Sequence, residues 1–502
     1  MKSTRTRSQR IARTAILAGL LALAAPAAGT QTAESGGNTQ VTDTSSKLAP
    51  ARRATWDNID RRGRSVPIEV GAGGGWYFWP PVLQWRYMDP ADWATSDPIF
   101  EVMLYPPYSG SATNAESFFL QVPTTNIVPV ADRGMVIGFH GYELSPSQIF
   151  GVKAMSTDLP EYCTQNGWFL LAPTGILTTN MGSLPSQRAL EMALALIVGL
   201  FDFNWDKMYS MGFSAGALSA ASFAMRHLDP GALLPAGIIY HTGTIDLIRE
   251  YNQQSAQTQT LWAGPDHFGD TFANDPFAYH RVNNARFNAA GDDFSDDHFA
   301  FKSLKHVPFY LHVNLNDPTH LPGWNMELEE KFSSDGFTYR AVTGSTATPK
   351  HTIHSIDYPD ALAYISQFEA GPLPTSAELF ADRPAKYLWS KMISDPAPEV
   401  ARYAVDIDAP ANSFDISDTH HVGILGFDLA LMGLDPLQVL NFTAASGDST
   451  SDTYVLIGYP AAPSSVLVDG VAPVSWSYDP VKAEVSITPN SSGGVATVQV
   501  IP

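Results

Sequence analysis

The stretch MYSMGFSAGA, residues 208–217, contains a Gly-x-Ser-x-Gly motif between a short β-prone run and a small-residue helical segment, residues 217–225. This pattern predicts a sharp turn from a strand into a helix, with Ser214 at the turn. Glycines are needed on both sides of the serine because a Cβ atom there would collide with the neighbouring helix or strand. The turn would lift the Ser214 hydroxyl above the sheet and leave the Ala215 amide at a helix N-terminus, where it can stabilise an oxyanion.

The segments around this turn predict an α/β fold. Short apolar runs alternate with helical patterns from about residue 117, which is typical of a mostly parallel sheet covered by helices on both faces. We therefore predict a doubly wound sheet over residues 116–370. The expected strands cover residues 118–122, 134–139, 168–173, 207–211, 235–240, 308–313 and 337–342, and the expected helices cover 146–166, 185–201 and 359–368.

An aromatic-rich insertion, about residues 244–305, interrupts this alternation. Long insertions of this kind are usually functional, and one that enters above the carboxyl ends of the strands can cover the crevice there. We interpret the insertion as a cap that shapes an apolar pocket. Its aspartates lack the glycine and the distal glutamate of an EF-hand loop, so they indicate a solvated acidic turn and no calcium site. These aspartates are Asp292, Asp293, Asp296 and Asp297.

A serine nucleophile needs a base and an orienting acid. In a sheet of this kind the order along the chain is serine, acid and histidine, each in a loop at the carboxyl end of a strand. Asp317 follows one expected strand, and His351 lies between the next strand and the last helix of the region. We predict Ser214, Asp317 and His351 as the catalytic residues.

Both partners of the serine have an alternative. Asp246, which follows the strand ending at Tyr240, is a rival acid. His354 is a rival base, although His351 is preferred because it lies closer to the end of its strand. A metal site built on His351 and His354 would need further ligands, and the sequence offers none nearby. We therefore expect no metal and no organic cofactor.

An oxyanion hole needs a second backbone amide in addition to that of Ala215. Residues 138–142, Gly-Phe-His-Gly-Tyr, end the first strong strand of the region. Gly141 lets the backbone approach the substrate, and we expect the Tyr142 amide to point at the oxyanion. We expect His140 to support this loop through hydrogen bonds and not to act as the base.

The amino-terminal residues have the pattern of a secretory signal peptide, predicted for residues 1–27. An apolar run over residues 15–25 is too short to span a membrane and is followed by a small-residue cleavage site. Residues 28–48 are rich in Gly, Ser, Thr and Gln, as in a disordered spacer. We expect a protein secreted to the periplasm or the medium. The basic residues of the signal are Lys2, Arg5, Arg7, Arg10 and Arg13.

The charge and the cysteine content exclude several functional classes. The net charge is −20, and loss of the five basic signal residues would take it to −25. Such a surface argues against nucleic acid or an anionic membrane as a partner. No other segment is apolar enough to enter a membrane. Because the surface is acidic, we expect a neutral substrate, either a small molecule or a polymer. The single cysteine, Cys163, excludes an internal disulfide and is expected in the core.

The regions flanking the α/β part differ from it in composition. Residues 49–115 form an aromatic-rich extension whose glycines and prolines suggest an irregular segment packed over the core. Residues 371–394 resemble a linker. Residues 395–502 predict a β-sandwich-like domain, because short alternating runs are separated by turn sequences. The expected strands are 402–408, 413–417, 422–429, 437–443, 453–458, 465–468, 474–478, 483–488 and 495–500.

The motifs at residues 138–142, 172–173 and 212–216, followed by Asp317 and His351, resemble the α/β-hydrolase superfamily. They are most similar to secreted esterases of the polyhydroxyalkanoate depolymerase and feruloyl esterase kind. The resemblance covers about residues 116–370 and implies hydrolysis of carboxylic esters through an acyl-enzyme intermediate. A serine peptidase of the same fold, or a non-catalytic polymer-binding protein on a hydrolase scaffold, is the alternative.

Overall fold

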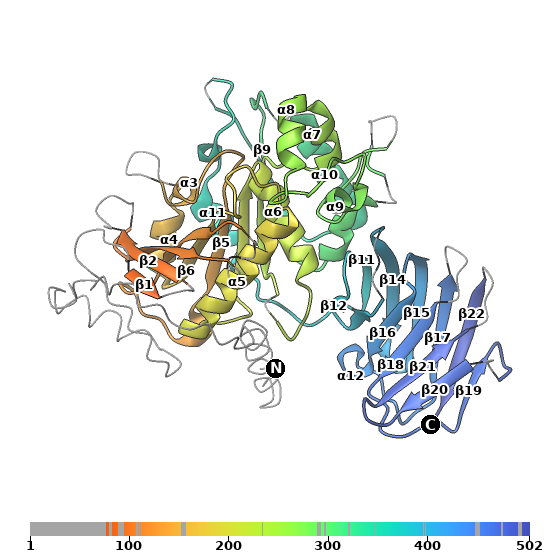
Figure 1. The fold of residues 1–502 in the computed structure, drawn as a ribbon. Helices are drawn as coiled ribbons and strands as arrows, with labels where there is room; N and C mark the ends of the chain where they lie inside the picture. Colours follow the sequence, from red (N-terminus) through yellow and green to blue (C-terminus); the bar gives the residue numbers. More distant parts are fainter. Residues whose placement is uncertain are drawn as a thin grey trace, which may run out of the picture.

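The computed structural model describes two regions, an α/β region and an all-β region (Figure 1). The predicted signal peptide and spacer lie outside the described residues, as do Asp292, Asp296 and Asp297. Among the described helices, none combines the length and the apolar character needed to cross a membrane. The described residues are 77–79, 83–88, 95–106, 109, 111, 113–151, 157–232, 234–288, 293–295, 298–319, 322–346, 348–394, 396, 398–446, 452–472, 475–489 and 494–502.

A ten-stranded sheet forms the centre of the α/β region, in the order β1-β2-β3-β4-β6-β5-β7-β8-β9-β10. The first four strands and the β4–β6 pair are antiparallel, whereas β6, β5, β7, β8, β9 and β10 run parallel. The order from β3 to β10 is that of the α/β-hydrolase fold. The strands are β1 (Tyr77–Trp79), β2 (Leu83–Met88), β3 (Ile99–Leu104), β4 (Glu116–Gln121), β5 (Met135–Phe139), β6 (Phe169–Pro173), β7 (Met208–Phe213), β8 (Gly237–His241), β9 (Phe309–Asn314) and β10 (Tyr339–Gly344).

Helices cover both faces of this sheet because its central strands are apolar on both sides. Along β5, Met135 and Ile137 pack in one core with α5 and α6, and Val136 packs in another with α3, α4 and α11. This alternation follows from the two-residue period of a strand. Cys163 lies in the second core and is fully buried. The helices are α3 (Ser147–Phe150), α4 (Leu159–Asn166), α5 (Leu184–Leu200), α6 (Ala215–Arg226), α10 (Pro322–Asp335) and α11 (Tyr358–Ile365), with 3-10 turns η3 (Val130–Asp132) and η6 (Ile353–Ser355).

The insertion between β8 and β9 is helical and has a core of its own. Figure 1 shows α7 and α8 beyond the end of β9. Aromatic side chains of the insertion pack with Ala215 and Leu218 of α6, so the cap rests on the start of the helix that follows Ser214. Its helices are α7 (Leu247–Gln253), α8 (Ala256–Trp262), α9 (Pro276–His280) and the 3-10 turn η5 (Ala300–Leu304).

The all-β region consists of two six-stranded sheets that pack face to face. Phe414 of one sheet and Phe427 of the other lie 5.0 Å apart, centroid to centroid, in the shared core. The sheet orders are β11-β14-β15-β17-β22-β19 and β12-β13-β16-β18-β21-β20. The elements are β11 (Ser376–Ala381), β12 (Ala385–Tyr387), β13 (Ser390–Met392), β14 (Ala401–Asp408), η7 (Ala409–Ala411), β15 (Ser413–His420), β16 (Ile424–Asp428), α12 (Leu429–Met432), β17 (Leu440–Ser446), β18 (Thr453–Ile457), β19 (Ser465–Val468), β20 (Ser475–Asp479), β21 (Glu484–Thr488) and β22 (Val495–Ile501).

The structure corrects three boundaries expected from the sequence. The described part of the extension, residues 49–115, contributes β1, β2 and β3 to the main sheet, where an irregular cover was expected. The presumed linker, residues 371–394, contains β11, β12 and β13, so the all-β region begins at Ser376. The single helix expected over residues 146–166 is divided into α3 and α4, because Gly151 ends α3 with a φ of 64°.

The two regions share one hydrophobic core and a buried ion cluster. Apolar side chains of α6, β9 and α10 belong to the same cluster as those of β11, β14 and β16. Asp382, between β11 and β12, accepts from Arg226 of α6 and Arg281 after α9, at 2.8 and 2.9 Å. Backbone bonds from Leu388 to Leu228 and from Phe380 to the Ser303 hydroxyl complete the junction.

Candidate active site

Ser214 occupies the strained turn that the Gly-x-Ser-x-Gly motif predicts. It lies between β7 and α6 with φ 60° and ψ −125°, a conformation that non-glycine residues rarely adopt. A Cβ atom on Gly212 would lie 2.1 Å from the Gly216 carbonyl oxygen, and one on Gly216 would lie 2.2 Å from the Phe139 carbonyl oxygen. Both glycines are therefore required by close backbone contacts.

Backbone hydrogen bonds hold the strained turn in place. The Ser214 amide donates to the His241 carbonyl oxygen of β8 at 3.1 Å. The Ser214 carbonyl oxygen accepts from the amides of Ala217 and Thr244, at 3.0 and 3.2 Å. Thr244 lies where the chain leaves β8 for the cap. The turn at Ser214 is thus fixed both to the neighbouring strand and to the start of the cap.

Asp317 and His351 form a close pair at the carboxyl ends of β9 and β10. His351 Nδ1 lies 2.6 Å from Asp317 Oδ2, and the Asp317 side chain is fully buried. Asp317 Oδ1 accepts from the Thr319 amide at 2.8 Å. The two loops are also joined by Asn314, whose side-chain amide donates to the Lys350 carbonyl oxygen at 2.7 Å. The carboxylate therefore has a fixed orientation toward the imidazole.

The Asp317 contact determines which nitrogen of His351 can accept a proton. A carboxylate only accepts, so Nδ1 carries the hydrogen and Nε2 of the neutral ring keeps a lone pair. The His351 ring stacks on Phe213, with centroids 4.5 Å apart and an angle of 27°. Phe213 immediately precedes Ser214, so this stacking holds the imidazole beside the Ser214 turn.

The loop after β5 begins against the start of α6. A Cβ atom on Gly216 would lie 2.2 Å from the Phe139 carbonyl oxygen and 2.6 Å from that of His140, so the first turn of α6 packs directly on the end of β5. Neither Tyr142 nor Ala215 donates a backbone hydrogen bond within the described part of the chain, as expected for Ala215 at the first helical position. The Tyr142 hydroxyl accepts from Trp262 Nε1 of the cap at 3.2 Å. The cap thereby touches the expected oxyanion loop.

Buried polar groups support this loop from behind. The ring nitrogens of His140 lie 2.8 and 3.1 Å from the carbonyl oxygens of Gly141 and Thr174, and burial lowers the pKa of His140. Glu116 accepts from three backbone amides of residues 174–176. Burial raises the pKa of Glu116 to about 7, although these three hydrogen bonds oppose the shift. His140 thus has the supporting role expected from the sequence.

The structure does not bring the two alternative residues to the Asp317–His351 pair. Asp246 caps α7, where its carboxylate accepts from the amides of Ile248, Arg249 and Phe287. His354 is exposed, and no carboxylate of the described residues forms an ion pair with it. The Asp246 carboxylate is thus engaged at the start of α7, whereas Asp317 is the carboxylate that contacts His351.

Three residues near the pair were not identified from the sequence. Phe213 lies inside the motif, but its stacking on His351 depends on the fold. His241 ends β8 next to the Ser214 turn, and nothing in the sequence distinguishes it from a histidine buried in the core. Glu250 of the cap lies close enough to His351 for the charge of that ring to affect it. Burial raises the pKa of Glu250, whereas a hydrogen bond from Gln254 and the charge of His351 oppose the rise.

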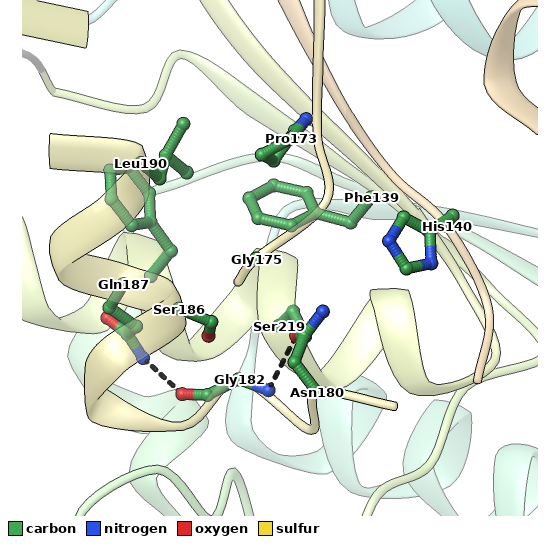
Figure 2. A pocket seen from close by; sticks show the side chains of 11 residues that line it. Phe139, His140, Pro173, Gly175, Asn180, Gly182, Ser186, Gln187, Leu190 and Ser219 are labelled. Carbon is green, nitrogen blue, oxygen red and sulfur yellow. Dashed lines mark hydrogen bonds between the residues drawn. The ribbon is translucent and has the colours of Figure 1, made fainter. Parts of the chain in front are cut away.

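A small cavity, with room for little more than a water molecule, lies between β5, the loop after β6 and α5, and its lining includes neither Ser214 nor His351 (Figure 2). Gln187 Nε2 donates to the Gly182 carbonyl oxygen at 2.9 Å on one side of the cavity. His140 and Ser219 line the other side. The cavity therefore lies behind the oxyanion loop. In the described part of the chain, no group of three or more His, Cys, Asp or Glu side chains is arranged to hold a metal ion.

Comparisons with known proteins extend only to structure. No family model matches the sequence, and no curated protein matches it. The chain is similar to an S-formylglutathione hydrolase from Agrobacterium tumefaciens, with 11% identity, a TM-score of 0.39, and coverage of 55% of this chain and 96% of that one. An esterase from Thermogutta terrifontis has 16% identity, a TM-score of 0.33, and coverage of 51% and 85%.

A third structure is much longer than the matched part. It is a candidate dipeptidyl aminopeptidase IV from Bacteroides ovatus, with 10% identity and a TM-score of 0.38. The match covers 54% of this chain and 35% of that protein, so this chain spans about a third of its length. At such identities the three likenesses concern the fold alone, and a fold does not define a function.

Proposed function

We propose that this protein is a serine hydrolase that cleaves carboxylic esters with Ser214, His351 and Asp317. The observation that carries the proposal is the 2.6 Å contact between His351 Nδ1 and Asp317 Oδ2, with the same imidazole stacked on the residue before Ser214. A serine at a strained strand-to-helix turn, a histidine and a buried carboxylate in this order are the parts of an acyl-transfer site.

The reaction follows from these positions. Ser214 Oγ attacks the ester carbonyl carbon while His351 Nε2 takes the hydroxyl proton. The amides of Ala215 and Tyr142 stabilise the negative charge that develops on the carbonyl oxygen. Asp317 stabilises the imidazolium, which then gives its proton to the leaving alcohol. Water, deprotonated by His351, attacks the acyl-enzyme and releases the acid and the free Ser214 hydroxyl.

The cap supports an ester with an apolar or aromatic acyl part. Trp262 and Tyr251 belong to the cap core, and Trp262 contacts Tyr142 of the oxyanion loop edge-on, with centroids 6.1 Å apart. In the proposed site the ring of Tyr142, which is only partly buried, would lie close to the reacting carbonyl, and an aromatic surface there favours apolar groups. We propose a secreted enzyme of the polyester depolymerase or feruloyl esterase kind, exported by residues 1–27.

The test is hydrolysis of p-nitrophenyl esters from acetate to palmitate and of methyl ferulate, by the wild type and by Ser214→Ala. We expect activity in the wild type and a loss of at least 1000-fold in the variant. Ser210→Ala is the matched control, because the Ser210 hydroxyl is buried on β7, the strand that leads to Ser214, and has no hydrogen-bond partner among the described residues. Equal activity of Ser214→Ala and the wild type would refute the assignment.

Two further assays separate the alternatives. Turnover of peptides but not esters, with fluorophosphonate labelling of Ser214, would favour a serine peptidase of the same fold. A folded wild type that neither labels nor turns over any substrate would favour a non-catalytic scaffold. Fractionation of cells that express the full chain tests export, and retention of the whole protein in the cytoplasm would contradict it.

A further inference from the structure

We propose that His241 is a positioning residue that couples the nucleophile turn to the loop carrying the base. This inference rests on the proposed serine hydrolase function. His241 is the last residue of β8 and is fully buried. Its backbone touches the residue that attacks the substrate, and its side chain touches the segment that holds the base. No sequence motif marks it.

The backbone of His241 holds Ser214. Its carbonyl oxygen accepts the Ser214 amide proton at 3.1 Å, next to the position where φ is 60°. A conformation of this kind persists only where surrounding contacts fix it. The position of the His241 backbone therefore sets the position of the turn.

The ring of His241 holds the loop that follows His351. Its Nε2 lies 2.8 Å from the Ser355 hydroxyl, and its Nδ1 lies 3.0 Å from the Tyr358 hydroxyl. Ser355 ends η6, and Tyr358 begins α11. Both lie within seven residues of His351 along the chain. One imidazole thus fixes two points of the base-bearing segment.

The direction of these hydrogen bonds can be assigned. The Ser355 hydroxyl donates its single proton to the Thr352 carbonyl oxygen at 3.1 Å, so it accepts from His241 Nε2–H. Nδ1 of the neutral ring is then an acceptor, and the buried Tyr358 hydroxyl donates to it. A directed chain therefore runs from Tyr358 through His241 and Ser355 to the backbone of Thr352, one residue after the base.

The His241 ring stays neutral in this environment, so each hydrogen bond from Tyr358 through His241 to Ser355 keeps its donor and its acceptor. Burial lowers the pKa of His241 well below its ordinary value, and the neighbouring histidines lower it further. His312 packs edge-on against it with centroids 4.6 Å apart, and burial lowers the pKa of His312 to about 4. Neither ring gains a proton near neutral pH, so the donor and acceptor roles do not reverse.

Aromatic packing supplies a second link between the same elements. The Phe213 ring contacts His241 with centroids 4.9 Å apart and stacks on His351 at 4.5 Å. A shift of the His241 ring would therefore move Phe213, which precedes Ser214, and the imidazole that rests on it. Displacements of about 1 Å between reacting groups can lower a rate about 100-fold.

The experiment compares His241→Met with His241→Gln. Both side chains are flexible and similar in length, but glutamine can place an amide N–H near the position of Nε2 and donate to Ser355. We expect the kcat of His241→Met to be about 100-fold below that of the wild type, with KM changed less than threefold. The kcat of His241→Gln should be about tenfold higher than that of His241→Met. The rate of fluorophosphonate labelling of Ser214 should fall in parallel with kcat.

Tyr358→Phe tests the same chain if the His241 variants fail to fold. It removes one hydroxyl, and we expect kcat to fall about tenfold at unchanged KM. Tyr310→Phe is the matched control, because the Tyr310 hydroxyl bonds Asp360 of the same helix and does not contact His241; its kcat should match the wild type. Folded variants of His241 and Tyr358 with kcat within twofold of the wild type would overturn the proposal.

The outcomes separate this inference from the proposed function. An inactive wild type that does not label would refute the hydrolase itself, and His241 would then have no reaction to support. An active wild type with unaffected His241 and Tyr358 variants would leave the hydrolase intact and refute the coupling alone. Equal kcat losses in Tyr358→Phe and Tyr310→Phe would also refute it, because a general loss of helix packing would explain both.

Discussion

Replacement of Asp382 by asparagine should destabilise the whole molecule, because this carboxylate joins the all-β region to the helix that begins at the nucleophile turn. Its side chain is 4% exposed, as is that of Arg226, which donates to it at 2.8 Å. Arg281 donates to the same oxygen at 2.9 Å. Burial raises the pKa of Asp382, but Arg226 and Arg281 outweigh burial and hold it below its ordinary value.

The size of the expected stability loss follows from the two arginine charges that the substitution leaves without a carboxylate. Asp382→Asn keeps the shape but removes the charge opposite two guanidinium groups, one of them almost fully buried. Removal of one partner of a buried ion pair costs about 3–5 kcal/mol in the free energy of unfolding. For the roughly 400 residues that the structure describes, an unfolding entropy of about 2.1 cal/mol/K per residue converts this loss to a decrease in Tm of about 4–6 °C.

Differential scanning calorimetry at pH 7 measures this decrease. Asp406→Asn is the control, because Asp406 is an exposed residue of β14 for which the structure records no ion pair among the described residues; its Tm should stay within 1 °C of the wild type. A decrease below 1 °C for Asp382→Asn, or one equal to that of the control, would show that the cluster does not hold the two regions together.

Three further predictions concern the active site and its support. Asp317→Asn should lower kcat about 10⁴-fold at nearly unchanged KM, because an amide cannot hold the His351 tautomer; ester hydrolysis checks this. Gly216→Ala should lower kcat at least 100-fold, since its Cβ would lie 2.2 Å from a strand carbonyl oxygen. Gly199→Ala, where a Cβ meets nothing within 4 Å, should leave kcat unchanged. The pKa of Glu116 rises from 4.5 to about 7 on folding, so its contribution to stability is fully present below pH 4.5 and is lost as the pH rises through 7, by about 3 kcal/mol. Glu116→Gln should flatten this part of the Tm–pH curve, and an unchanged slope would contradict the assignment.

The fold and the parts of the site that obey local rules could be predicted from the sequence. Gly212 and Gly216 are needed by the turn itself, so the motif identifies Ser214 without any knowledge of distant contacts. The order of the motifs along the chain predicts that Asp317 and His351 lie close together, as they do, because parallel strands deliver their carboxyl ends to one edge of the sheet. Alternation also predicts the nine strands from β14 to β22, whose boundaries shift by at most three residues.

Features that depend on contacts between distant segments could not be predicted in this way. The strands β1 to β3 are preceded by a glycine-rich run and separated by prolines, which conceal that they extend the main sheet beyond β4. The strands β12 and β13 have three residues each, too few for a period to be visible. His241 has no distinguishing neighbours in sequence, and only the fold brings Ser355 and Tyr358 to its ring.

The junction between the two regions bears on how the all-β region can function. Its β11 strand packs on η5, and Asp382 binds the last residue of α6, whose first residue follows Ser214. A binding module that swings freely on a linker would not share a core with the α/β region. Deletion of residues 376–502 would expose that core and leave the Arg226 guanidinium without the Asp382 carboxylate. A loss of activity on deletion would therefore reflect lost stability and not lost substrate binding. Binding of insoluble polyesters by this region is therefore better tested by substitutions at exposed apolar positions such as Val471 and Val495, which are 66% and 67% exposed.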